Sequence, residues 1–185
     1  MKELSLNILD ITENSVKAGA TLTEILLTED DETLTVTIKD DGCGMDAETA
    51  KNAVDPFYTT RTTRKVGMGL PLFRLEAEQT GGSFSLTSRS REEHPDSHGT
   101  EVTASFYKTH IDYTPLGDVI STVTTLVQGH PDTDFLFRHE KNGKEVLLDT
   151  RVLREALDGV PLNSFEVILW IKESLESEYS ELNCK

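Results

Sequence analysis

The chain has 185 residues, 36% hydrophobic and 28% charged, a composition that is typical of a folded globular protein and excludes a largely disordered one. The 33 Asp and Glu residues outnumber the 18 Lys and Arg residues and give a formal net charge of -15, which opposes broad contact with nucleic acid or anionic lipid. No apolar run approaches the roughly 20 residues of a membrane span and the N-terminus shows no signal-peptide cleavage site, so we expect a cytoplasmic protein that binds neither nucleic acid nor membrane.

The first residues repeat with the period of an amphipathic helix, which we expect over residues 3 to 18. One face carries apolar and small side chains, namely Leu4, Ile8, Ile11, Ser15 and Ala18. A second stripe with the same spacing is polar and consists of Asn7, Asp10, Asn14 and Lys17. A polar stripe of this kind is usually solvated.

Strands and helices then follow in mixed order. The predicted elements are strands at residues 22–28 and 33–39, helices at 46–54 and 68–79, and strands at 83–88 and 100–107. In the second strand Leu34, Val36 and Ile38 alternate with polar residues, so we expect one face of it to be buried. Pro71 falls in the first turn of the second of these helices, where proline is tolerated.

The pattern changes after residue 107, with no flexible linker at the change. We expect a helix within residues 115–129, a hairpin over 134–150 that turns at Asn142-Gly143, and helices near 150–158 and 164–181. The sequence therefore predicts a domain over residues 1–107 and a packed α-β-β-α-α extension of unknown role over 108–185. An apolar stripe in the last helix predicts packing on the domain or on a second subunit of a homodimer, and it consists of Val167, Trp170, Ile171 and Leu175.

Five short motifs follow one another in the first 107 residues. They are DITENSVKAGAT, IKDDGCGM, DPFYTTR, VGMGLPL and GTEVTASF. Each is weak alone, because glycine pairs and strand-end aspartates are common in turns. As an ordered set they resemble the GHKL superfamily, which comprises DNA gyrase, the heat-shock chaperone, histidine kinases and mismatch-repair ATPases.

The resemblance covers residues 4 to 107 and implies the Bergerat fold. This is an α/β fold, more fully an α+β two-layer sandwich, in which a mixed sheet carries helices on one face. It also implies that ATP, with Mg²⁺, lies between the first helix and the glycine loops.

On the first helix, Asn14 offers the oxygen ligand that Mg²⁺ prefers. Asp10 lies four residues earlier on the same face, and the resemblance implies a catalytic role for it in orienting a water. The superfamily often has Glu there when it hydrolyses ATP, so a structural or metal-orienting role for the shorter Asp10 stays equally open. Lys17 is a further candidate for contact with the nucleotide.

The second glycine-containing motif is the expected base site. Asp40 ends a strand, where its carboxylate can accept from an adenine amino group. Gly42 and Gly44 have no Cβ and allow the backbone a close approach, and Thr100 is expected by resemblance to contact the same base edge. The alternative for Asp40 is an ordinary turn cap.

A cationic loop interrupts the acidic chain before the 68–79 helix. Gly67 and Gly69 are expected to point backbone N–H groups at the phosphates, at a helix start where the dipole also favours anions. Arg61, Arg64 and Lys65 are expected to add positive charge over those phosphates. The alternative is a solvated basic loop.

Other reactive residues carry less weight. No histidine precedes Asn14, and the His139-Glu140 pair, which mimics a phosphoacceptor dipeptide, falls in the predicted hairpin. Cys43, between glycines, is expected to be a small buried filler.

The leading hypothesis is a Mg·ATP-dependent, kinase-like signalling protein that phosphorylates or regulates a separate protein partner. The alternative is a non-catalytic ATP-gated switch or adaptor.

Overall fold

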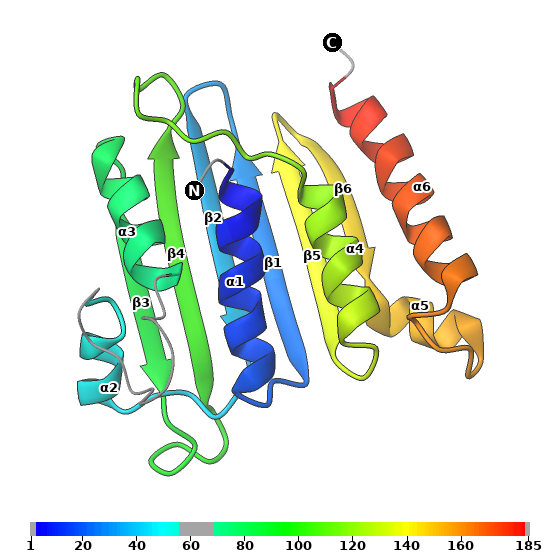
Figure 1. The fold of residues 1–185 in the computed structure, drawn as a ribbon, viewed down its shortest axis with the longest axis horizontal. Coiled ribbons are helices and arrows are strands. Elements are labelled where there is room, and N and C mark those ends of the chain that lie inside the picture. Colours follow the sequence, from blue (N-terminus) through cyan, green and yellow to red (C-terminus); the bar gives the residue numbers. More distant parts are fainter. Residues whose placement is uncertain (1–2, 56–68, 184–185) are drawn as a thin grey trace.

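The computed structural model describes residues 3–55 and 69–183 of the chain (Figure 1). Its strands form one six-stranded mixed sheet in the order β3-β4-β2-β1-β5-β6. Their bounds are Leu22–Glu29 for β1, Thr33–Asp40 for β2, Phe84–Arg89 for β3, Gly99–Tyr107 for β4, Asp134–Lys141 for β5 and Lys144–Asp149 for β6. Neighbouring strands are antiparallel except for β1 and β5, which are parallel.

Helices cover one face of this sheet. Their bounds are Leu4–Lys17 for α1, Ala47–Asn52 for α2, Gly69–Gln79 for α3, Val119–Gly129 for α4, Thr150–Leu157 for α5 and Phe165–Asn183 for α6. Figure 1 shows α3, α1 and α4 side by side in front of the strands, and α6 packs against α4 and β6. The expected fold class, a mixed sheet with helices on one face and an α-β-β-α-α extension, is therefore confirmed.

The core lies between the helices and the sheet because the strands alternate with a period of two. Leu34, Val36 and Ile38 of β2 are buried, and each lies opposite a buried residue of β4. The intervening threonines of β2 face away from the helices and are partly exposed. Of the helices within the described ranges, none has the length and apolar character needed to cross a membrane.

The residues after 108 extend this sheet, because β5 lies beside β1 and Ile25 pairs with Phe137. Asn142 and Gly143 both have positive φ values, of 50° and 80°, which is the backbone of a two-residue hairpin turn and confirms the turn expected there. In α6 three residues of the expected apolar stripe are buried, whereas Trp170 is 54% exposed.

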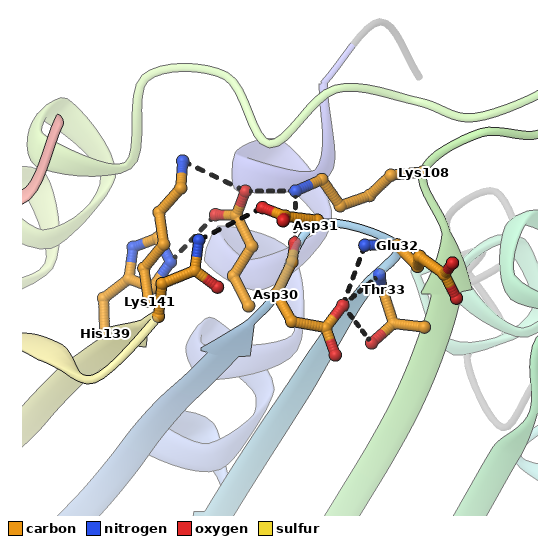
Figure 2. A network of polar contacts seen from close by, with 9 residues as sticks. Asp30, Asp31, Glu32, Thr33, Lys108, His139 and Lys141 are labelled. Atoms are coloured by element: carbon orange, nitrogen blue, oxygen red, sulfur yellow. Dashed lines mark hydrogen bonds and ion pairs between the residues drawn. The ribbon is translucent and has the colours of Figure 1, made fainter. Parts of the chain in front are cut away.

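A polar cluster joins the extension to the rest of the fold at the end of β1 (Figure 2). One carboxylate oxygen of Glu29 accepts from Lys108 Nζ at 2.7 Å and Lys141 Nζ at 3.2 Å, and the other lies 3.1 Å from His139 Nε2. Nδ1 of the buried His139 lies 2.8 Å from the hydroxyl of Tyr179 on α6. The cluster thus connects β1, β5, α6 and the segment that follows β4.

The same contacts set the ionisation of Glu29. Burial is the largest single influence and raises the pKa of this carboxyl group, but the hydrogen bonds from His139, Lys108 and Lys141 together outweigh it. They lower the pKa from 4.5 to about 2. A folded-state pKa below the unfolded value means that the ionised group stabilises the fold above pH 4.5, and that this contribution is lost as the pH falls toward 2.

We therefore expect Glu29→Gln to lower the free energy of unfolding at pH 7 by about 3 kcal/mol, since each pKa unit corresponds to about 1.4 kcal/mol. The difference from the wild type should shrink as the pH falls below 4.5, as measured by urea unfolding. Glu176→Gln, which alters an exposed i,i+4 ion pair, is the control and should change stability by less than about 0.5 kcal/mol. A Glu29→Gln deficit that stays constant down to pH 3 would contradict this account.

Candidate functional site

A pocket of about 250 Å³ opens between α1, the end of β2, the start of β4 and the start of α3. Its walls are mostly apolar and include Ile11, Ile38, Met45, Leu70 and Val102. Its polar lining consists of Asn14, Ser15, Asp40 and Thr100. An apolar cleft with a few convergent polar groups is the usual form of a small-molecule site.

The Asp40 carboxylate is the centre of this polar lining. Its Oδ2 accepts from the hydroxyl of Ser15 at 2.7 Å, and its Oδ1 accepts from the backbone N–H groups of Gly42 at 2.9 Å and Thr100 at 3.2 Å. One side chain therefore connects α1, the turn after β2 and the start of β4. Since a carboxylate can accept about four hydrogen bonds, Oδ2 retains capacity for a ligand donor.

Close backbone contacts make this arrangement possible only with glycine. Gly44 has a φ of +65°, and a Cβ there would lie 1.9 Å from the carbonyl oxygen of Arg89. Gly99 has a φ of +135°, and its Cβ would lie 2.0 Å from the carbonyl oxygen of Asp40. At both positions a larger residue would strain the backbone and would clash with the facing carbonyl oxygen. The turn after β2 therefore lies directly against the β3–β4 connection.

A hydroxyl pair holds the other side of the pocket. The register of β2, β4 and β3 places Asp40, Thr100 and Ser88 in one row across the sheet. The hydroxyl oxygen of Ser88 lies 2.9 Å from Thr100 Oγ1 and accepts from the backbone N–H of Met45 at 2.8 Å. Thr100 is thus fixed by a neighbour on β3 as well as by Asp40.

Three polar residues of this region were not predicted from the sequence, namely Ser15, Ser88 and the adjacent Asp41. Ser15 carried one signal, a hydroxyl on the otherwise apolar stripe of the first helix, whereas the role of Ser88 depends on strand register. Asp41 accepts from the backbone N–H groups of Thr21 at 2.7 Å and Leu22 at 3.0 Å. Partial burial is the largest influence and raises the Asp41 pKa, but these bonds outweigh it and the pKa is lowered.

Cys43 lies on the turn and differs from its prediction, because it is exposed rather than buried. Its backbone is tightly held, since its N–H donates to Ala18 O at 2.9 Å and its carbonyl accepts from Arg91 N–H at 2.8 Å. The close packing in this turn is made by the glycines and the main chain, and the exposed thiol lies 3.5 Å from the carbonyl oxygen of Gly44 at the lining of the pocket.

The first helix brings two of its three candidate residues to the site. Asn14 is exposed and lines the pocket. Asp10 lies one turn earlier against the start of α3, where a Cβ on Gly69 would lie 2.2 Å from Asp10 Oδ2. Lys17 does not line the pocket, and its ammonium group lies 3.7 Å from the carboxylate of Glu13.

Of the remaining candidates for phosphate contact, the structure describes one. Gly69 is the first residue of α3, a helix that the sequence predicted over residues 68–79. Arg61, Arg64, Lys65 and Gly67 lie outside the described residues. Within those that are described, no group of three or more His, Cys, Asp or Glu side chains is placed to hold a metal ion.

Comparison with known proteins gives one family. The family described as "Histidine kinase-, DNA gyrase B-, and HSP90-like ATPase" matches residues 2–110, a span that includes all the pocket residues named above. Among curated proteins, no sequence matches the chain significantly.

Solved structures are similar in fold at low identity. The N-terminal domain of a DNA repair protein has a TM-score of 0.56 and 16% identity, over 80% of this chain and 53% of that one. The Aquifex aeolicus MutL ATPase domain complexed with ADP has a TM-score of 0.56 and 17% identity, over 85% of this chain and 68% of that one. The mycobacterial sensor histidine kinase MprB has a TM-score of 0.42 and 18% identity, over 55% and 69%. The chain spans about half the length of the first of these, with 53% covered.

We expect Gly99→Ala to cost about 2 to 4 kcal/mol of folding free energy, because it adds both backbone strain and overpacking. Urea unfolding at neutral pH is the measurement. The matched control is Gly129→Ala at the end of α4, where a Cβ meets nothing within 4 Å and alanine should be neutral or slightly stabilising. Equal effects of the two substitutions would show that the contact with the Asp40 carbonyl does not constrain the site.

Proposed function

Because the chain belongs to the family of histidine kinase-, DNA gyrase B- and HSP90-like ATPases, we propose that it binds Mg·ATP and acts in signal transduction on a separate protein. This family is the superfamily expected from the five sequence motifs. In this proposal residues 1–107 form the nucleotide-binding unit and residues 108–185 are an extension that completes its sheet. The protein is proposed to be cytoplasmic.

The observation that carries the proposal is the orientation of the Asp40 carboxylate in the pocket. Three donors fix it, and among the described residues Oδ2 receives only the Ser15 hydroxyl. That oxygen is suited to accept from the exocyclic amino group of adenine, while Ile38, Met45, Leu70 and Val102 supply apolar surface for a purine ring. In the similar MutL domain the bound nucleotide is ADP, which agrees with this choice of ligand.

The phosphates would lie toward α3 and the mouth of the pocket. Gly69 begins α3, and the free N–H groups of a helix start favour phosphate oxygens. Asn14 would contribute a side-chain oxygen to Mg²⁺, which supplies charge neutralisation when bound. Gly67, Arg61, Arg64 and Lys65, which lie outside the described residues, are proposed to add donors and positive charge to the phosphates, with Lys17 as a further contact.

The reaction proposed is transfer of a phosphoryl group to a partner, which depends on positioning and charge neutralisation rather than on a covalent intermediate. Asp10 would orient the attacking hydroxyl or water from its place beside the start of α3. The short side chain of Asp10 favours the alternative, an ATP-gated switch that catalyses no reaction. A carboxylate one methylene shorter than Glu reaches less far into the site.

Calorimetry with ATP and Mg²⁺ tests the binding step. We expect saturable binding by the wild type and a loss of at least about tenfold for Asp40→Asn, since a hydrogen bond to a charged group contributes about 1.5 to 3 kcal/mol. Asn14→Ala should weaken binding with Mg²⁺ present and have a smaller effect in EDTA. Asp132→Asn, at an exposed position outside the pocket, is the control and should bind as the wild type does. An absence of wild-type binding would refute the proposal.

Phosphoryl transfer is tested separately. Cell extract incubated with the protein and γ-labelled ATP should give one labelled partner, and Asp10→Asn should abolish the label while calorimetry still shows nucleotide binding. If label never transfers, and a partner instead responds equally to ATP and to a non-hydrolysable analogue, the switch replaces the kinase.

A further inference from the structure

Helices α1 and α3 lie side by side on the sheet and run in opposite directions (Figure 1). Between them lies a buried polar pair, in which Nδ2 of Asn7 donates to Oε2 of Glu76. Asn7 is fully buried and Glu76 is 9% exposed. The polar stripe expected to be solvated along α1 is therefore covered at Asn7 by α3, and it reaches solvent at Asp10 and Asn14.

Burying this polar pair between two helices costs folding free energy. A buried carboxylate loses its hydration, and replacement of buried polar or ionic groups by apolar residues of similar volume is often neutral or stabilising. The Oδ1 atom of Asn7 also lacks a hydrogen-bond partner among the described residues, which adds to the cost. Stability alone therefore does not account for the pair.

The apolar surroundings of the Asn7–Glu76 pair indicate that the pair contributes directionality to the packing of the two helices. Both helices contribute apolar side chains to the common core, among them Ile8, Phe73 and Ala77. Apolar contact is non-directional and leaves helices some freedom to slide or rotate. A hydrogen bond between Asn7 and Glu76 has fixed length and direction, so it selects one register of α3 along α1.

That register decides the shape of the candidate site. Asn7 is about one turn before Asp10 on α1, and Glu76 is about two turns after Gly69 on α3. In the observed register the Asp10 carboxylate lies against Gly69, and the next residue, Leu70, lines the pocket. A shift of α3 would move both contacts at once.

We propose that Asn7 and Glu76 are positioning residues of the nucleotide site. They act on the nucleotide only through α3, by fixing Gly69 and Leu70 relative to Asp10 and Asn14. This inference rests on the proposed function, because it concerns the affinity of the same pocket for nucleotide.

The experiment compares ADP affinity with thermal stability in a set of full-length variants. Asn7→Leu/Glu76→Leu replaces the pair by apolar groups and should retain the wild-type helical signal and melting temperature or exceed them. Its affinity for Mg·ADP should nevertheless fall at least tenfold. Glu76→Gln keeps the acceptor and adds an N–H that can pair with Asn7 Oδ1, so it should keep the wild-type affinity within twofold.

Phe73→Leu is the matched control on the same helix, at a side chain that packs against Phe106 of β4. It removes buried volume from α3 and should lower the melting temperature while leaving ADP affinity within twofold, which separates positioning from stability. Should the double variant fail to fold, Glu76→Met alone removes the acceptor and should show the same tenfold loss.

The inference is overturned if the double variant or Glu76→Met binds ADP as tightly as the wild type. It is also overturned if Phe73→Leu, at equal or lower stability than the double variant, loses as much affinity. Failure of the wild type to bind ADP is a different result, because it refutes the proposed function itself.

Discussion

The architecture of the pocket depends on one carboxylate held from three directions. Asp40 receives a hydroxyl from α1, a backbone N–H from its own turn and a backbone N–H from β4. Removing it would leave three donors facing the pocket without their acceptor, a costly arrangement wherever the site excludes water. The packing of Gly44 and Gly99 follows from the same need, since each brings main chain within reach of the residues around Asp40. The side chain that shapes the pocket is thus also the one that offers an acceptor to a ligand.

The candidate pocket and the Glu29 cluster lie at opposite ends of the sheet. Asp40 ends β2, and Glu29 ends β1 at the opposite end of that antiparallel pair. Around Glu29, charged groups connect β5 to β1 and to the segment that follows β4, and a second contact between the extension and α1 joins His130 Nε2 to Glu13 at 2.6 Å. Because β5 is paired along the whole of β1, the extension completes the core on which α1 rests. The position of Asn14 therefore depends on residues well beyond the family motifs.

Patterns among neighbouring residues were enough to predict most of the helices and strands and part of the site. Alternation predicted the buried face of β2, and Asn142-Gly143 predicted the hairpin turn, because each is a property of adjacent residues. Contacts made between distant segments were not predictable in this way. Ser88 reaches Thr100 through strand register, and Asn7 meets Glu76 because α3 packs beside α1. Cys43 shows the converse error, since flanking glycines suggested burial where the main chain alone makes the contacts.

The central claim is that the Asp40 carboxylate recognises the amino group of adenine. The most direct measurement compares the affinities of Mg·ADP and Mg·IDP for the wild type, because inosine carries a carbonyl where adenine carries that amino group. We expect ADP to bind at least about tenfold more tightly, since a hydrogen bond to a charged group contributes about 1.5 to 3 kcal/mol. Equal affinities for the two nucleotides would contradict the account, because the base would then be bound without the contact on which the site is built.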